Sequence, residues 1–305
     1  MYQVVRAERR DGPVMRQKNQ GNVEYLTFDL LEQTGMVNHL FTTRTGGFSQ
    51  GIYSSMNLSL NRGDSQEAVI RNYEQIAGVL GCDIGDMVAS HQTHTTNIRR
   101  VTGADRGKGV VIPRDYEDVD GLITNERDVV LATFFADCVP LYFVDREHEA
   151  IGLAHSGWRG TVAQMGACMV KAMEEQFGSR PERLIAAIGP SICQDCYEVS
   201  EEVAQGFSEL LQRMETEKIM REIAEGGYYT YSDGRPAQVI SQGRRKGKYQ
   251  LDLWLANLII LRNAGIPLSG IAVTDICTCH NPEYLFSHRA SDGKRGNLGA
   301  FLRIR

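Results

Sequence analysis

The sequence predicts an α+β fold with a mixed β-sheet. Short apolar runs that suit buried strands and segments that suit helices follow one another without the strict strand–helix alternation of a doubly wound fold. The 305-residue chain is 42% hydrophobic and 23% charged, which is typical of a globular protein and excludes a disordered, collagen-like or coiled-coil chain. No repeat or Pro/Ser-rich linker divides it, so we expect one continuous domain over residues 1–305.

Four segments carry the signals of helices. In the first, apolar residues recur at three- and four-residue steps, and the second consists of helix-forming residues stopped by a glycine. The third opens with a serine and two glutamates, which suit the positive end of the helix dipole. The fourth ends before a glycine that a proline closely follows. These helices are expected over residues 65–80, 161–177, 200–214 and 251–264.

Five short apolar runs predict buried strands. They lie at residues 129–135, 141–144, 151–154, 184–188 and 271–273. Residues 226–248 carry no recognisable motif and are expected to form a surface insertion, in which the basic cluster at 243–248 is typical of a solvated loop. The chain contains neither GxGxxG nor GxxxxGK[ST], so a dinucleotide or P-loop site has no support.

Charge and cysteine usage limit the partners that we expect. Lys and Arg total 33 and Asp and Glu total 38, a net charge of −5, so the chain lacks the basic excess of a general nucleic-acid binder. It starts without a signal-peptide pattern, and its longest apolar stretch is interrupted by Asp137. We expect a cytoplasmic protein without a membrane partner. Seven cysteines, an odd number, argue against a disulfide framework.

Three polar groups interrupt or end apolar runs and are the candidates for chemistry. They are the segment His91-Gln92-Thr93-His94, the pair Asp137-Cys138, and His155 at the end of an apolar run. Two imidazoles and a thiolate suit zinc, and three protein ligands leave the fourth tetrahedral position open for water. Such a water becomes a nucleophile near neutral pH.

The same atoms fit a second mechanism without a metal. Cys138 would be a nucleophile, His155 its general base, and Asp137 or another polar group would orient the base. An unpaired buried carboxylate is costly, so Asp137 needs a partner or a role in either case. The sequence supports both mechanisms.

The segment after His155 offers an anion site. The chain turns through Gly157 and Gly160 into the expected helix, whose first N–H groups would suit phosphate. Trp158 in this turn would either stack on a base or anchor the loop on the core.

Three further patterns are weaker. Residues 47–51 match GxSxG but lack the strand and helix that a nucleophile elbow requires. Cys193 and Cys196 form a single CxxC, which suits a redox pair, half of a zinc site or, as we favour, a plain turn. The segment from Cys277 to His280 reads CxCH, a spacing that fits neither a zinc-finger pair nor a haem attachment site.

Taken together, the motifs resemble one family, in the right order over about residues 40–305. The chain is similar to the YfiH/YlmD-like family, known as multicopper polyphenol oxidases or laccase-domain proteins and also as purine nucleoside phosphorylases. The motifs that carry the resemblance are FTTR at 41–44, QTH at 92–94, ADCVP at 136–140, AHSGWRG at 154–160, IGPSI at 188–192, CYEV at 196–199 and FSHR at 286–289.

The resemblance implies a fold and a metal. The fold is a layered α/β/β/α arrangement with mixed sheets, similar to the catalytic domain of the cytotoxic necrotizing factors, with residues 1–35 as an N-terminal extension of the same core. The metal is Zn²⁺ on His94, Cys138 and His155, with Cu²⁺ as another occupant. His91 has no counterpart in the family motif and is left out of the ligand set.

The resemblance also implies activities. They are phosphorolysis of adenosine, inosine and related nucleosides to base and ribose 1-phosphate, deamination of adenosine to inosine, and oxidation of phenols with copper. We assign proton transfer to Asp137 and phosphate binding to Arg44 and Arg159. Where the family usually reads Gly-Arg this chain has Gly296-Asn297, so any role of that arginine passes to Arg295, Arg289 or nothing.

Two other functions remain as alternatives. One is a metal-independent hydrolase that uses Cys138 and His155. The other is a protein that binds a nucleotide and performs no chemistry, for which a buried carboxylate beside a metal has no use.

Overall fold

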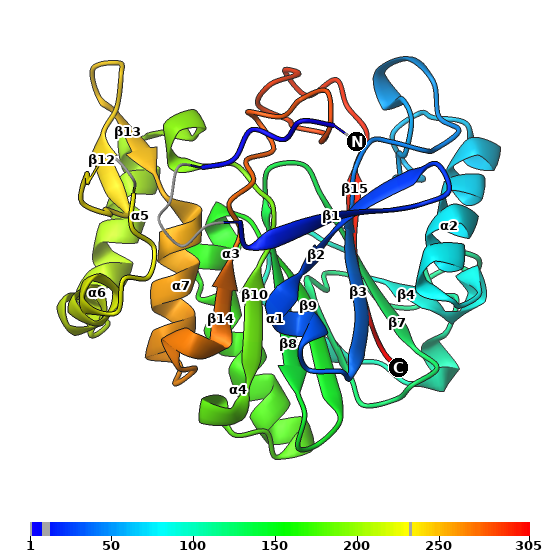
Figure 1. Cartoon of the computed structure of the whole chain (residues 1–305), viewed down its shortest axis with the longest axis horizontal. Coiled ribbons are helices and arrows are strands. Elements are labelled where there is room, and N and C mark those ends of the chain that lie inside the picture. The colour runs from blue at the N-terminus through cyan, green and yellow to red at the C-terminus, as the bar shows by residue number, and fades with distance from the viewer. Residues whose placement is uncertain (1, 8–12, 232–233) are drawn as a thin grey trace.

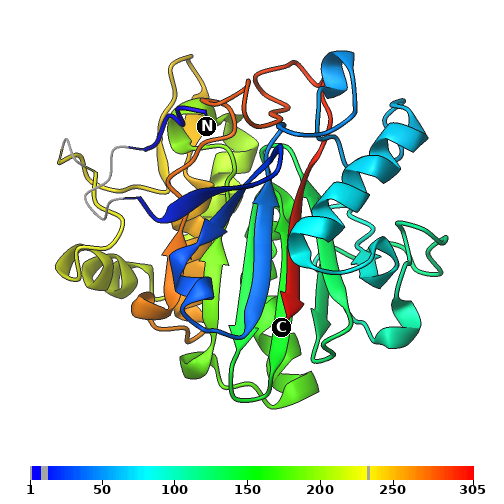
Figure 2. The ribbon, with the colours of Figure 1, turned by 45° about the vertical axis from the view of Figure 1, so that its right-hand side comes forward.

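Two six-stranded mixed sheets pack face to face in the structure, a computed structural model that describes residues 2–7, 13–231 and 234–305 (Figures 1 and 2). The strands of the first sheet, in spatial order, are β1 (Met15–Gln20), β2 (Val23–Phe28), β3 (Val37–Thr42), β15 (Leu298–Ile304), β7 (Val130–Phe135) and β4 (Met87–Ala89). Those of the second are β14 (Ile271–Val273), β10 (Ile185–Ile188), β8 (Val139–Asp145), β9 (Ala150–Ser156), β6 (Gly121–Thr124) and β5 (Ile98–Arg100). The pairs β4–β7, β10–β14 and β5–β6 are parallel and the others antiparallel.

Strand β8 shows why the central strands read as continuous apolar runs. Successive side chains of a strand point to opposite faces of the sheet. Leu141 and Phe143 therefore enter the core beneath the helices, whereas Tyr142 and Val144 enter the core between the two sheets. Every residue of β8 is buried, so the sequence shows no alternation of polar and apolar residues.

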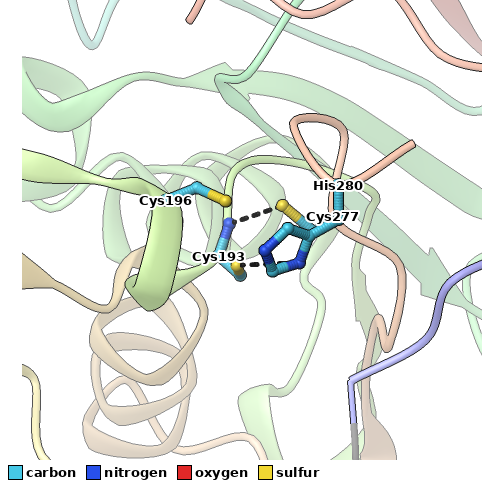
Figure 3. A group of neighbouring side chains, drawn as sticks. All are labelled: Cys193, Cys196, Cys277 and His280. Carbon is cyan, nitrogen blue, oxygen red and sulfur yellow. Dashed lines mark hydrogen bonds between the residues drawn. The ribbon is translucent and has the colours of Figure 1, made fainter. Parts of the chain in front are cut away.

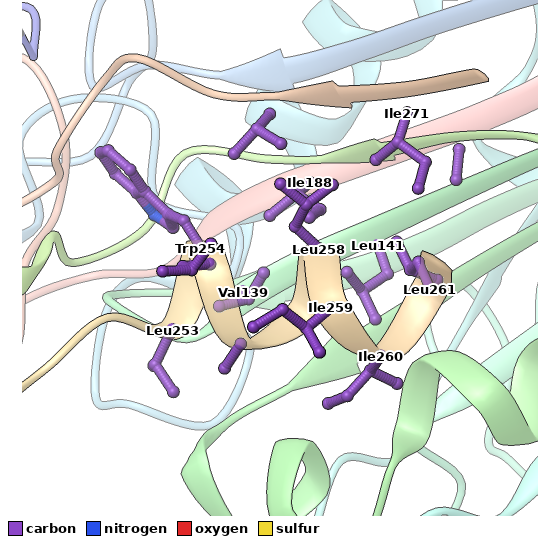
Figure 4. Packing of buried hydrophobic residues seen from close by; sticks show 14 of the residues in the cluster. Val139, Leu141, Ile188, Leu253, Trp254, Leu258, Ile259, Ile260, Leu261 and Ile271 are labelled. Atoms are coloured by element: carbon purple, nitrogen blue, oxygen red, sulfur yellow. The ribbon is translucent and has the colours of Figure 1, made fainter. Parts of the chain in front are cut away.

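Helices cover the outer face of each sheet. Helix α2 (Gln66–Leu80) covers the first sheet, where the Tyr73 ring meets Phe134 and Phe301 edge to face. Helices α4 (Met165–Phe177) and α7 (Leu253–Asn263) cover the second sheet. Figure 4 shows the side chains of α7 packed against residues of β8 and β10. The layers are therefore α/β/β/α, and the likeness to the necrotizing-factor domain stays a prediction.

A smaller unit flanks α7 at one end of the second sheet (Figure 1). It consists of α5 (Glu201–Gln212), α6 (Thr216–Glu225) and an antiparallel sheet of β11 (Glu198–Ser200), β13 (Lys248–Leu251) and β12 (Ile240–Gln242). Residues 243–247 of the basic cluster form the turn between β12 and β13, and Lys248 begins β13. Arg244, Arg245 and Lys246 are exposed in this turn as expected.

The expected elements are confirmed with one correction. The five predicted strands correspond to β7, β8, β9, β10 and β14, and three predicted helices correspond to α2, α5 and α7. A single helix over residues 161–177 is wrong. The chain instead forms α3 (Trp158–Val162) and then α4, separated by Gln164 in the left-handed conformation with φ 60°.

Two further elements, β1 and α1, have no clear signal in the sequence, because their segments are polar or short and carry little periodicity. Strand β1 reads MRQKNQ and gains its place from pairing with β2. The short helix α1 (Asp29–Glu32) follows β2 directly. In the described residues we find no helix with the length and apolar character that a membrane span requires.

The kink at Gln164 gives a test of backbone strain. A non-glycine residue pays about 1 kcal/mol in the left-handed region, so Gln164→Gly is expected to raise the free energy of unfolding by up to about 1 kcal/mol. Chemical denaturation measures the change. Its matched control is Ala163→Gly, because Ala163 has φ −79° and glycine there should lower stability. Destabilisation by Gln164→Gly as large as that of the control would contradict the strain argument.

Candidate active site

His94, Cys138 and His155 meet although 61 positions separate His94 from His155. One donor atom from each lies within 4.8 Å of the other two. The Cys138 sulfur is 4.0 Å from His94 Nε2, and the two imidazole centres are 5.0 Å apart. Cys138 precedes β8 and His155 lies in β9, the adjacent antiparallel strand, so sheet pairing fixes these two side chains next to each other.

The buried carboxylate of Asp120 holds both histidines of this cluster in place. Its Oδ1 lies 2.8 Å from His155 Nδ1. The same carboxylate accepts hydrogen bonds from the backbone N–H groups of Thr93, His94 and Thr95 at 3.0, 3.2 and 3.0 Å. His94 has φ 67°, and this left-handed residue turns three successive N–H groups toward one anion. Asp120 therefore places the His94 loop and directs His155 Nε2 toward Cys138.

Two further contacts position the loop that carries His94. The Gln92 side chain pairs with the backbone of Phe134, donating to its oxygen at 2.6 Å and accepting from its N–H at 2.7 Å. Gly157 leaves room for the cluster, because a Cβ there would lie 2.8 Å from His94 Cδ2 and 3.1 Å from the Cys138 sulfur. The glycine is thus required by the close approach of these two side chains, while its own φ of −74° is ordinary.

The charges of Cys138 and His155 stabilise one another. Burial opposes a thiolate, but the charge of His155 and hydrogen bonds from His155 and His94 lower the pKa of Cys138 to about 6. Burial opposes a cationic imidazole as well, yet the Cys138 charge and Asp120 raise the pKa of His155 to about 9. The protein thus presents a thiolate near neutral pH, the form that binds a metal or attacks an electrophile.

The donor set fits zinc. It supplies two nitrogens and one sulfur, and the second nitrogen of His155 is held by a carboxylate, the arrangement that orients metal-ligating histidines. Three protein ligands also leave a coordination position for a water or a substrate atom.

A cavity of about 280 Å³ opens beside these ligands and carries a positive wall. Arg62, Arg114 and Arg295 line it together with His94, Cys138 and His155. Burial and the charge of Arg62 lower the pKa of Arg295 to about 10. Its Nε is buried and has no hydrogen-bond partner among the described residues. Arg295 Nη1 donates to the backbone oxygen of Gly296, and Arg114 Nη1 donates to that of Ser90. The positive charge that these arginines bring to the cavity favours an anion there.

The structure places the other predicted residues outside the lining of this cavity. Arg44 donates to the backbone oxygens of Ser54 and Pro282 and lies over the Phe286 ring, so it braces two loops. Arg159 is exposed and stacks on Trp158 at 4.3 Å.

Asp137 is buried beside Cys138, and both of its oxygens are engaged. Oδ1 accepts from the Thr278 hydroxyl at 2.6 Å and Oδ2 from the Arg289 N–H at 2.7 Å. The predicted helix start after Gly160 is wrong, because α3 begins at Trp158.

The GxSxG segment at residues 47–51 is a loop. Ser49 accepts a hydrogen bond from Asn72 there, as expected for a structural serine.

Sequence reasoning missed Asp120, Arg62 and Arg114. The sequence contains a signal for Asp120, because this residue directly precedes the apolar strand β6. Cys138 and His155 lie at the ends of apolar strands in the same way. Arg62 and Arg114 lie in loops without periodicity, and only the fold brings them to the cavity.

The chain matches one family model and is similar to several named proteins. The family model described as multi-copper polyphenol oxidoreductase laccase matches residues 38–305. A protein of Bacillus subtilis (strain 168) named purine nucleoside phosphorylase YlmD is 37% identical over 266 residues, which make up 86% of each chain. A protein named adenosine deaminase RL5, from an unknown prokaryotic organism, is 29% identical over 271 residues, which make up 88% of this chain and 94% of that one.

Solved structures agree with the fold. The crystal structure of the Bacillus licheniformis hypothetical protein YfiH has a TM-score of 0.81 and 32% identity, and the match covers 95% of this chain and 99% of that one. The crystal structure of YlmD from Geobacillus stearothermophilus has a TM-score of 0.79 and 31% identity, with 96% and 99% covered.

The role of Asp120 leads to a prediction for metal affinity. Asp120→Asn keeps the shape of the side chain but removes the charge that His155 and the loop N–H groups face, so zinc should bind about 10- to 100-fold more weakly. Competition with a chromophoric chelator measures the affinity. Asp118→Asn is the control, since Asp118 is exposed and lies two residues away. Equal zinc affinity in both variants would contradict the role of Asp120.

Proposed function

The chain belongs to the family described as multi-copper polyphenol oxidoreductase laccase, and from that premise we propose that it is a zinc-dependent enzyme of purine nucleosides. The proposed reactions are phosphorolysis of adenosine, inosine and related nucleosides to base and ribose 1-phosphate, and deamination of adenosine. Relatives named purine nucleoside phosphorylase and adenosine deaminase support both reactions. The observation that carries the proposal is a Cys/His/His donor set beside an arginine-lined cavity.

His94, Cys138 and His155 are the residues that would hold the zinc ion. When bound, the ion would supply a Lewis acid and lower the pKa of a water molecule. Asp120 keeps the Nδ1 proton of His155 in place, so that Nε2 remains the ligand atom. Gly157 allows the donor atoms to approach each other.

Arg62, Arg114 and Arg295 are the residues that we propose for phosphate. In phosphorolysis a phosphate oxygen forms a bond to C1′ of the ribose, the bond from C1′ to the purine nitrogen breaks, and the purine leaves with the electron pair and takes up a proton. Guanidinium groups hold the phosphate by charge-assisted hydrogen bonds. The phosphate roles expected of Arg44 and Arg159 remain predictions, and the loop contacts of Arg44 support a bracing role instead.

Asp137 is our proposed proton carrier. It adjoins Cys138, and hydrogen bonds from Thr278 and Arg289 fix the orientation of its carboxylate. Each oxygen keeps lone-pair capacity beyond the one hydrogen bond described here.

Two alternatives each have an observation in their favour. The description of the matching family favours a copper-dependent polyphenol oxidase, and Cu²⁺ binds nitrogen and sulfur ligands more tightly than Zn²⁺. The thiolate–imidazolium pair favours a metal-independent hydrolase that uses Cys138 and His155. Chelators should leave such a hydrolase active, and iodoacetamide should alkylate Cys138 rapidly.

We further propose that residues 1–305 work as one domain, with residues 1–35 extending the same core. The pairing of β1 and β2 onto β3 in the first sheet supports this. The cytoplasmic location and the absence of nucleic-acid and membrane partners stay predictions.

Product analysis tests the proposed reactions. Purified protein is incubated with adenosine, with and without phosphate, and the products are identified by mass spectrometry. Without phosphate we expect inosine alone. With phosphate we expect adenine, hypoxanthine and ribose 1-phosphate as well. Unchanged adenosine from protein that contains zinc would contradict the proposal.

The arginine wall predicts a split between the two reactions. Arg295→Ala and Arg62→Ala should each raise the KM for phosphate about 10- to 100-fold, because each removes charge-assisted hydrogen bonds. Deamination, which needs no phosphate, should change little. Arg62 is exposed, so its variant should keep the fold, and exposed Arg183 provides the control variant Arg183→Ala. An unchanged phosphate KM in both cavity variants would exclude this wall as the phosphate site.

A further inference from the structure

We propose that Cys193, Cys196, Cys277 and His280 form a second, structural metal site that binds zinc (Figure 3). The site is distinct from the one at His94, Cys138 and His155 and shares no residue with it. Its donor set is three sulfurs and one nitrogen, a complete tetrahedron of the kind that closes structural zinc sites.

The distances match a tetrahedral zinc ion. One donor atom from each of the four residues lies within 4.8 Å of the other three. Zn–S and Zn–N bonds of about 2.3 and 2.0–2.1 Å place two sulfurs roughly 3.8 Å apart and a sulfur and a nitrogen roughly 3.6 Å apart. The Cys193 sulfur lies 3.7 Å from His280 Nδ1. Figure 3 shows the four side chains converging on one point from two segments of the chain.

The fold builds the site from two neighbouring loops. Strands β10 and β14 are parallel neighbours, so their carboxyl ends reach the same edge of the second sheet. The loops that follow them stay paired. Ser191 and Cys277 form an isolated parallel β-bridge, and Thr278 donates its N–H to the Ser191 oxygen at 3.1 Å. Residues 84 positions apart, Cys193 and Cys277, are thereby brought together. The short helix η5 (Gln194–Cys196) turns Cys196 back toward them.

The surroundings favour thiolates at this position. The Cys193 N–H donates to the Cys277 sulfur at 3.3 Å, and a backbone donor of this kind is strongest toward a charged acceptor. Cys193 and Cys277 are buried, whereas His280 is exposed, so the ion would lie near the surface with its sulfurs inward. All seven cysteines lie in the described residues and are free thiols.

This site would also stabilise the proposed active site. Thr278, which lies between two of the cysteines of the CxCH segment, donates to Asp137, and Asp137 directly precedes Cys138. An ion that fixes the 277–280 loop therefore fixes the partner of Asp137. A CxxC and a CxCH that each look ordinary in the sequence form one site because the fold pairs their loops.

Metal counting on the full-length protein tests the proposal. Elemental analysis should find two zinc ions per chain in the wild type and one in Cys138→Ala. It should also find one in Cys277→Ser and in His280→Ala, and none when Cys138→Ala and Cys277→Ser are combined. Cys168→Ser is the control and should keep two, because Cys168 belongs to neither cluster. His280→Ala keeps the test valid if Cys277→Ser fails to fold, since His280 is exposed.

X-ray absorption at the zinc edge identifies the donors. In Cys138→Ala the remaining ion should show three sulfurs and one nitrogen. One zinc in the wild type and none in folded Cys138→Ala would overturn the second site and leave the proposed function intact. One zinc in the wild type that Cys138→Ala retains would overturn the first site instead. Five reactive thiols in denatured, unreduced protein, rather than seven, would reveal a disulfide among these cysteines and overturn the zinc proposal.

Discussion

The rest of the site depends on the hydrogen bonds that the buried carboxylate of Asp120 makes to His155 and to the His94 loop. The carboxylate is enclosed between β6 and the His94 loop, and its charge is balanced by His155 and by three backbone N–H groups. A buried carboxylate without such partners would be costly. The same hydrogen bonds that satisfy Asp120 therefore fix both histidines of the proposed metal site. Burial of the carboxylate and the geometry of the two imidazoles are thus set by the same contacts.

The second sheet supplies the rigid frame for both proposed metal sites. One site uses the start of β8, the end of β9 and the His94 loop, and the other uses the loops after β10 and β14. The Asp137–Thr278 hydrogen bond joins the two. Sheet pairing thus holds the side chains of each cluster at fixed distances from one another, although they come from distant segments. The loops that carry Arg62, Arg114 and Arg295 form the wall of the cavity beside the first cluster.

Much of this could be predicted from the sequence, for identifiable reasons. The buried strands can be predicted because they are apolar runs in the sequence. Cys138 and His155 can be predicted as site residues because they lie at the ends of such runs. Strand β1 could not be predicted, since its polar residues gain their order from pairing. The break at Gln164 has no glycine or proline to mark it. Arg62, Arg114 and the Cys193–His280 pairing depend on tertiary contacts that no local pattern contains.

Metal-dependent release of ribose 1-phosphate from inosine tests the central claim most directly. The protein is stripped of metal, reloaded with zinc, and assayed with inosine and phosphate at each stage, alongside Cys138→Ala treated in the same way. We expect no release from the stripped protein, recovery on addition of zinc, and no recovery in Cys138→Ala. Full activity in the stripped wild-type protein would contradict the account.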